Sequence, residues 1–182
     1  PHHVTLTERA ICNDLTANKI SKEFIPNAYN TNAKVAPPLR TPKDVEALID
    51  GVVDDTINVF ATDHAPHAYE EKATTFESAA FGISTLETTL SSLLLLVSQN
   101  KMSLKTVIKK LTQEPAKILN LPLGTLSPGS LADIVVFNPK HVWRISNESL
   151  LSKGKNSPWL GKTMVGKVVL TIANGEVVYQ KK

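Results

Sequence analysis

The sequence predicts an α/β protein that ends in β-rich structure. An amphipathic helical pattern followed by a short apolar run is half of an α/β repeat. Further helical patterns follow, and after residue 120 short β-rich runs alternate with turn residues. We therefore predict an α/β portion over residues 1–120 and a β-rich appendage over residues 121–182.

The composition excludes several classes of function. The chain has 182 residues, of which 42% are hydrophobic, and this is enough for a core of ordinary size. The net charge is +3 but the basic residues are scattered, so we expect no nucleic-acid partner. The longest apolar run, residues 93–97, is too short to span a bilayer. The single cysteine, Cys12, rules out an internal disulfide framework and fits a reducing compartment, so we expect a cytoplasmic protein.

The first helix is predicted over residues 42–52. Thr41 supplies an N-cap, Pro42 suits the first helical position, and Asp44 places an acid in the first turn. Apolar residues then recur at helical spacing, which predicts a buried face made of Val45, Leu48, Ile49 and Val52.

Three more helices and four strands are predicted after residue 85. The helices cover residues 86–97, 103–111 with Ser103 as the cap, and 115–119 with Pro115 at the start. The strands cover residues 133–137, 141–145, 167–173 and 176–179. Asn174-Gly175 between the last two strands is a strong signal for a two-residue hairpin.

Asp63 is the first candidate for chemistry. It follows the apolar run 57–62, which predicts a parallel strand covered on both faces. Side chains at the carboxyl ends of strands point into the active site of a parallel α/β barrel. A carboxylate there can bind a metal and exchange a proton with metal-bound water. The alternative interpretation is that Asp63 caps the following turn.

Several motifs resemble, in order and spacing, those of the type I dihydroorotases in the amidohydrolase superfamily. The motifs are KVAPPLR at residues 34–40, ATDHAPH at 61–67, Phe81-Gly82-Ile83 with Leu86-Glu87-Thr88, GSLAD at 129–133, and SKGKNSP at 152–158. The resemblance runs from Pro1-His2-His3 to the closing hairpin.

The resemblance implies the C-terminal portion of a metal-dependent (β/α)8 hydrolase barrel, comprising the end of strand 7, strand 8 and the following helices, plus a small β-domain. It implies reversible cyclisation of N-carbamoyl-L-aspartate to dihydroorotate, in pyrimidine biosynthesis. Asp63 matches the aspartate that binds zinc and acts as acid and base, passing a proton from the zinc-activated hydroxide to the leaving amide nitrogen.

The resemblance also assigns the substrate contacts and the other histidines. His67, Phe81, Gly82 and the position of Ala36 match substrate-binding positions. His64 is expected to pack or to support the site from behind. His2 and His3 are expected to end strand 7 beside the site without binding zinc, and His141 is expected to lie in the surface or packing of the appendage.

The metal site implied by the resemblance cannot be completed from this chain. The family also uses a His-x-His pair, a carboxylated lysine or an aspartate, and two further histidines, whereas the chain has five histidines in all, at 2, 3, 64, 67 and 141. One protein ligand does not hold a catalytic zinc. We therefore expect a fragment that is inactive alone and needs the N-terminal half of the barrel to bind one or two zinc ions. A homodimer or higher oligomer is expected.

Ala36 departs from the family pattern, which commonly has Asn at this place and uses it to contact the substrate. Allantoinases carry Ala-Pro-Pro here, so an allantoinase or hydantoinase is the enzymatic alternative. A non-catalytic partner of aspartate transcarbamoylase is the second alternative. Retention of Asp63 and His67 argues against it, because a scaffold needs no acid/base at a strand end.

Overall fold

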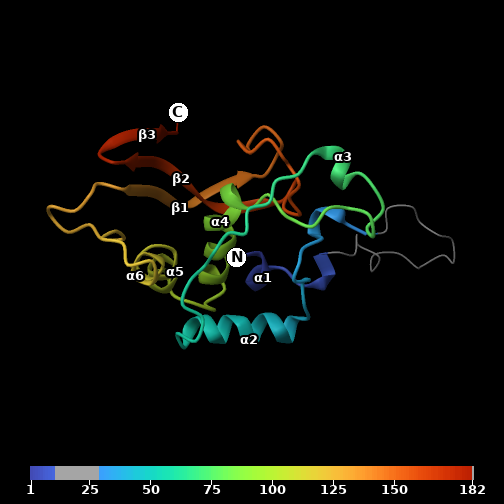
Figure 1. Ribbon diagram of the computed structural model, residues 1–182, viewed down its shortest axis with the longest axis horizontal. Coiled ribbons are helices and arrows are strands. Elements are labelled where there is room, and N and C mark those ends of the chain that lie inside the picture. Colours follow the sequence, from blue (N-terminus) through green and yellow to red (C-terminus); the bar gives the residue numbers. More distant parts are fainter. Residues whose placement is uncertain (11–28, 182) are drawn as a thin grey trace.

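The structure is a computed structural model, and it describes residues 1–10 and 29–181 (Figure 1). Helical elements come first and three strands follow. Cys12 lies outside the described residues. The short elements at the beginning and in the loops are α1 (His2–Thr5), η1 (Glu8–Ala10), η2 (Thr31–Ala33), α3 (Tyr69–Lys72) and η3 (Leu86–Thr88). In the described part of the chain, no helix combines the length and the apolar character that a membrane crossing requires.

The helix predicted over residues 42–52 is confirmed as α2 (Pro42–Val53). Thr41 Oγ1 accepts a hydrogen bond from the Asp44 N–H at 3.3 Å, and Asp44 Oδ2 accepts one from the Thr41 N–H at 3.1 Å. This reciprocal pair satisfies donors that the start of a helix otherwise leaves without partners. Val45, Ile49 and Val52 are buried, as predicted.

The other predicted helices are confirmed with small shifts at their ends. The second begins as the tight turn η3 and continues as α4 (Thr89–Ser98). The third is α5 (Leu104–Leu111), in which the Ser103 hydroxyl accepts from the Thr106 N–H at 3.0 Å. The last, α6 (Gln113–Ile118), starts two residues before Pro115, because proline is tolerated in the first turn of a helix.

The main core lies between α1, α2, α4 and α5. Figure 1 shows α2 along the lower edge of the molecule, with α4 between it and the sheet. The buried members of this core are Val4, Val45, Ile49, Val52, Leu93, Leu96, Met102 and Val107.

The predicted strand at residues 57–62 is wrong for this chain. Its backbone is bonded instead to helical neighbours: the Ile57 N–H donates to the Gly51 carbonyl and the Phe60 N–H donates to the Lys110 carbonyl. Among the described residues, the only strand-like pairing nearby is the single parallel bridge between His64 and Ile83. A parallel strand needs a neighbouring strand to form a ladder. The expected strand end at Pro1-His2-His3 is also wrong, because residues 2–5 form the helical turn α1.

The β-rich appendage is confirmed as an antiparallel sheet with strand order β1-β2-β3. β2 is Thr163–Ala173 and β3 is Glu176–Gln180. The two strands predicted at 133–137 and 141–145 join into one, β1 (Ile134–Arg144), and a register shift between Asn138 and Val142 marks the predicted break. Asn174 and Gly175 have φ of 51° and 82°, which is the backbone of the predicted hairpin turn.

The sheet is joined to α4 at one tightly packed point. The Trp143 indole N–H donates to the Gly166 carbonyl at 3.0 Å and contacts the Ser91 hydroxyl at 3.1 Å. Gly166 has φ of 94°, and a Cβ at this position would lie 2.2 Å from Leu94 Cδ1. Only glycine therefore allows β2 to approach α4 this closely.

Candidate active site

Asp63 lies at the end of an extended segment, and its neighbours are fixed while its side chain is exposed. The Thr85 hydroxyl donates to the Thr62 carbonyl at 2.9 Å, and the Ala65 N–H donates to the Ile83 carbonyl at 3.0 Å. Asp63 itself has φ of 48°, a left-handed conformation that is uncommon outside glycine and that collects at functional sites.

The Asp63 carboxylate faces the start of α1. Within residues 1–10 and 29–181, no hydrogen bond joins the Asp63 carboxylate to a backbone N–H, so the turn-cap interpretation has no support there. An exposed carboxylate of this kind can bind a cation or exchange a proton.

The His64 side chain connects the Asp63 turn to two other segments of the chain. Its Nδ1 accepts from the backbone N–H groups of Thr85 and Leu86, each at 3.1 Å. Since Nδ1 is an acceptor, the ring proton is on Nε2, which lies 3.2 Å from the Ser152 hydroxyl. Both ring nitrogens of His64 therefore have partners within the chain. Binding a metal would require breaking one of these contacts.

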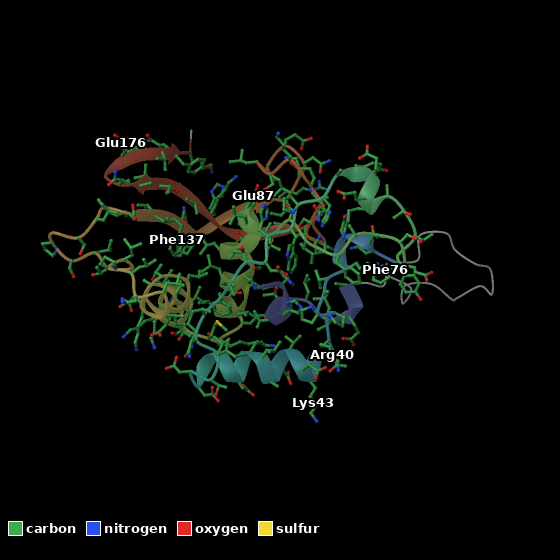
Figure 2. All side chains as sticks on the ribbon, viewed as in Figure 1. Arg40, Lys43, Phe76, Glu87, Phe137 and Glu176 are labelled. Atoms are coloured by element: carbon green, nitrogen blue, oxygen red, sulfur yellow. The ribbon has the colours of Figure 1, made fainter. Side chains whose placement is uncertain are left out.

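Ser152 connects His64 to Glu87. The Ser152 hydroxyl and backbone N–H both donate to Glu87 Oε1, at 2.8 Å and 2.7 Å. Burial raises the pKa of Glu87, but the hydrogen bonds from Ser152 outweigh it and hold that pKa below its usual value. Figure 2 shows Glu87 in the middle of the molecule, near α4. An ionised Glu87 thus holds the segment around Ser152 against the Asp63 turn.

Asn156 is a site residue whose role the sequence did not reveal. Asn156 is only 4% exposed, and both the oxygen and the nitrogen of its side-chain amide make hydrogen bonds. Oδ1 accepts from the His67 N–H at 2.8 Å, and Nδ2 donates to the Ala65 and Gly82 carbonyls, each at 3.0 Å. Asn156 lies within the SKGKNSP motif, which the sequence analysis had singled out, but the residues that it contacts lie far away in the sequence.

The hydrogen bonds of Asn156 to residues 65, 67 and 82 form a group that we call the Asn156 hub. His67 belongs to it through its backbone, and the ring of His67 faces two acceptors. Nε2 is 2.9 Å from the Phe81 carbonyl, and Nδ1 is 3.3 Å from Glu71 Oε2. The Ala68 N–H also donates to that Glu71 oxygen, at 2.9 Å. The structure therefore brings His67 and Phe81 together.

Gly82 is enclosed by partners from this chain. Its N–H donates to the Lys34 carbonyl at 2.9 Å, and its carbonyl accepts from Lys72 Nζ and Asn156 Nδ2. These backbone groups are occupied, so Gly82 can contribute to a site by shape but not by a further strong hydrogen bond from its N–H. The Phe81 side chain, in contrast, is 57% exposed.

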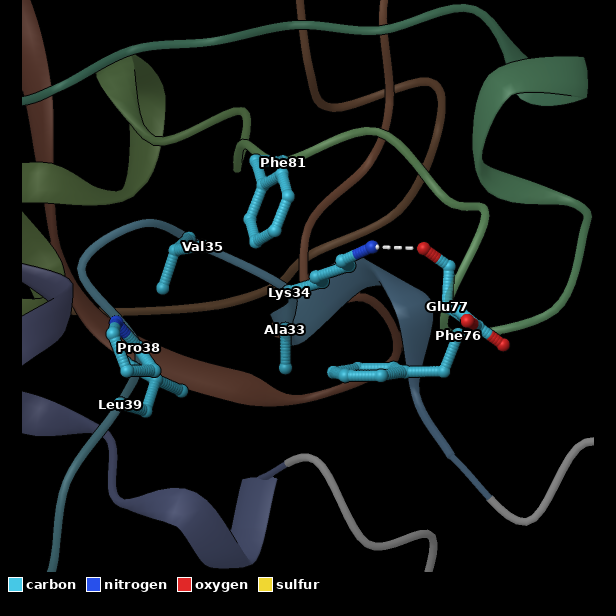
Figure 3. Close-up of a pocket in the computed structure, with 8 residues that line it drawn as sticks. All are labelled: Ala33, Lys34, Val35, Pro38, Leu39, Phe76, Glu77 and Phe81. Atoms are coloured by element: carbon cyan, nitrogen blue, oxygen red, sulfur yellow. Dashed lines mark hydrogen bonds between the residues drawn. The ribbon is translucent and has the colours of Figure 1, made fainter.

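Lys34 and Lys72 form the other side of this region. Lys34 Nζ donates to the carbonyls of Glu77 and Ala79, each at 2.7 Å, and lies 4.3 Å from the centre of the Phe81 ring. Figure 3 shows the Lys34 side chain between the rings of Phe76 and Phe81. It borders an apolar hollow lined by Ala33, Lys34, Val35, Pro38, Leu39, Phe76, Glu77 and Phe81. Of the predicted site residues only Phe81 lines that hollow, so we do not place the substrate there.

Ala36, His2 and His3 lie on the α1 side. Ala36 is exposed and offers no polar side-chain group. His3 Nε2 is 2.9 Å from the Pro37 carbonyl. His2 is 2% exposed, and neither of its ring nitrogens has a partner in the described part of the chain. Burial and the neighbouring His3 lower the pKa of His2 to about 3, so its ring is neutral near pH 7.

Asp63 could supply one ligand to a metal. Residues 1–10 and 29–181 contain no cluster of three or more His, Cys, Asp or Glu side chains that could hold a metal ion. A zinc site takes three or four protein ligands. The donor chemistry of Asp63 therefore fits a shared site, with other ligands from outside the described residues.

The chain is similar to several known proteins. The chain is 44% identical over 181 residues to a dihydroorotase from Syntrophus aciditrophicus (strain SB), covering 100% of this chain and 39% of that protein. It resembles the solved L-hydantoinase from Arthrobacter aurescens, with a TM-score of 0.75 and 30% identity over 81% of this chain and 34% of that one. The D-hydantoinase from a Bacillus sp. AR9 shares the fold, with a TM-score of 0.79 and 24% identity over 99% and 38% of the two chains.

The likenesses to the dihydroorotase and to the D-hydantoinase extend over the helical portion and the sheet together. The chain spans 39% of the length of the dihydroorotase that it matches. Residues 2–178, which include both the Asp63 turn and the β-rich appendage, match the amidohydrolase family, and the chain therefore belongs to that family.

Proposed function

We propose that these residues are the C-terminal part of a dihydroorotase, which interconverts dihydroorotate and N-carbamoyl-L-aspartate in pyrimidine synthesis. The observation that carries the proposal is the Asp63 turn: residues 62, 64 and 65 are all bonded to residues 83–86, while the Asp63 carboxylate is exposed. Fixed neighbours hold a reactive group in one geometry, as catalysis requires. Similarity over the whole chain to a dihydroorotase supports the choice of substrate.

Asp63 is proposed to move the proton. In ring opening, water attacks the ring amide carbonyl of dihydroorotate, and Asp63 accepts a proton from that water. Asp63 then returns the proton to the ring nitrogen as the C–N bond breaks, and the reverse order closes the ring. His67 and the exposed face of Phe81 are proposed to orient the substrate beside Asp63, and Ala36 is proposed to border it.

Zinc is the proposed cofactor, one or two ions in the complete site, and when bound it would activate the attacking water. Asp63 is the ligand that this chain would contribute. The ring nitrogens of His64 are used in holding the turn, so we propose that the remaining ligands come from the N-terminal half of the enzyme. The chain by itself is then inactive, and its partner is that half of the barrel.

The test is Asp63→Asn in the full-length enzyme. Asparagine keeps the side-chain shape and tolerates the left-handed backbone, so the fold should be retained. Loss of the carboxylate should lower kcat for dihydroorotate hydrolysis by at least about 100-fold. The matched control is Asp50→Asn, an exposed aspartate on α2. Turnover within tenfold of wild type, with the control unchanged, would contradict the role of Asp63.

A hydantoinase is the alternative that one observation favours. Ala36 offers no polar group where dihydroorotases commonly have Asn, and the solved L-hydantoinase shares 30% identity with the chain. The two functions differ in substrate charge, because dihydroorotate carries a carboxylate and unsubstituted hydantoin does not. Comparing kcat/KM for the two compounds separates them: faster turnover of hydantoin would replace the dihydroorotase assignment.

A further inference from the structure

Two buried lysines bind one short stretch of backbone beside the proposed site. Lys34 is 7% exposed and Lys72 is 5% exposed. Lys34 Nζ donates to the carbonyls of Glu77 and Ala79, and Lys72 Nζ donates to those of Ala80, at 2.7 Å, and Gly82, at 3.0 Å. The two ammonium groups thus share four carbonyls of residues 77–82, which we name the carbonyl segment.

Backbone carbonyls, and not carboxylates of the described residues, are the partners of the two lysines. Among the described residues, neither ammonium group has a carboxylate within 4.0 Å. Burial and the charge of Lys34 lower the pKa of Lys72 to about 8, and Glu71 opposes that change only in part. Lys72 is therefore mainly charged at pH 7. A buried charge that is not neutralised projects its potential into the neighbouring space.

The carbonyl segment ends at the residues proposed to contact substrate. Phe81 lies within the segment, its ring is 4.3 Å from Lys34 Nζ, and its carbonyl is 2.9 Å from the His67 ring. Gly82 closes the segment and bonds to Asn156 as well as to Lys72. Any shift of the carbonyl segment would therefore move Phe81 and the partner of His67.

We propose that Lys34 and Lys72 are paired positioning residues that fix the Phe81 side of the site and supply the positive potential that attracts an anionic substrate. The inference rests on the proposed function, because dihydroorotate and N-carbamoyl-L-aspartate are both anions. It assigns the lysines to substrate binding and not to the proton transfer at Asp63. A purely structural role would satisfy the four carbonyls without contributing to substrate affinity.

The experiment compares Lys72→Gln and Lys72→Arg in the full-length enzyme, with Lys43→Gln as the control. Glutamine keeps a hydrogen-bond donor and removes the charge, whereas arginine keeps both. Lys43 is exposed at the start of α2 and points away from the molecule in Figure 2. Steady-state kinetics with dihydroorotate at pH 7, at low and at high ionic strength, give KM, kcat and the salt dependence.

The expected result is that Lys72→Gln raises KM about tenfold and changes kcat by less than about twofold. In the wild type, kcat/KM should be higher at low than at high ionic strength. This difference should become smaller in Lys72→Gln and should persist in Lys72→Arg and in the Lys43→Gln control. Lys34→Gln, measured in the same way, should repeat the Lys72→Gln result and covers the case in which that variant does not fold.

Two outcomes would overturn the inference, and they differ from failure of the proposed function. If the wild type hydrolyses dihydroorotate but Lys72→Gln and Lys34→Gln keep its KM and its salt dependence, the lysines only support the backbone. If the variants lower kcat at unchanged KM, they act on the chemical step. If a folded, zinc-loaded wild type does not hydrolyse dihydroorotate at all, the proposed function fails and the inference falls with it.

Discussion

Replacing Asn156 by alanine tests how much the Asn156 hub, which connects the Asp63 turn to the carbonyl segment, contributes to the free energy of unfolding. The substitution removes three side-chain hydrogen bonds, to the His67 N–H and to the carbonyls of Ala65 and Gly82. The Gly82 carbonyl keeps its contact with Lys72 Nζ, so two backbone groups lose this partner.

The magnitude follows from those two groups. A buried backbone group left without a partner costs about 1–3 kcal/mol. Water cannot easily replace the amide, because Asn156 is 4% exposed and the neighbouring Gly154 lies directly against the His67 backbone. We therefore expect Asn156→Ala to lower the free energy of unfolding by about 2–6 kcal/mol.

The assay is urea unfolding of the full-length protein, with Asn138→Ala as the matched control. Asn138 is exposed, and its Oδ1 accepts a local hydrogen bond from the Lys140 N–H at 2.9 Å, which water can replace. The control should change the free energy of unfolding by less than about 0.5 kcal/mol. If Asn156→Ala is no more destabilising than Asn138→Ala, the hub is not a stabilising element and the reasoning is wrong.

Two further predictions concern packing and pH. Gly166→Ala should lower the free energy of unfolding by about 2 kcal/mol or more, because the added Cβ would collide with Leu94 and because φ is 94°. A melting temperature equal to that of the wild type would contradict the close packing of β2 against α4. The pKa of Lys72 is about 8 in the folded protein and about 10.5 in the unfolded chain. Between pH 8 and 10.5 the unfolded chain therefore binds more protons than the folded protein. The free energy of unfolding of the wild type should rise with pH over this range, by at most about 3 kcal/mol. Urea titrations at pH 7.5 and 10 should show no such gain in Lys72→Met, and an equal gain in both proteins would contradict the assignment to Lys72.

Local features of the fold were determined by the sequence alone. The Thr41 and Asp44 pair, the helical spacing of Val45 to Val52 and the Asn174-Gly175 turn each involve residues close in the chain, and each was confirmed. The physical reason is that caps, amphipathic faces and two-residue turns depend on neighbours within about one turn of helix or hairpin. Asp63 was singled out for the same reason, because it directly follows an apolar run.

Tertiary structure decided the features that depend on distant partners. The run at 57–62 has strand composition but lacks a described neighbouring strand, and a ladder cannot be formed by one segment. The sequence led us to expect that His64 packs or supports the site, but only the structure shows that its ring nitrogens contact Thr85, Leu86 and Ser152.

The same holds for the residues that surround the proposed site. Asn156 reaches a residue 89 positions away, and Lys34 reaches residues 43 and 45 positions away. Composition and spacing show which side chains can donate hydrogen bonds, but only folding determines which acceptors they meet. The sequence therefore singled out the Asp63 carboxylate and the family resemblance, while the three-dimensional structure determined how the turn around that carboxylate is held.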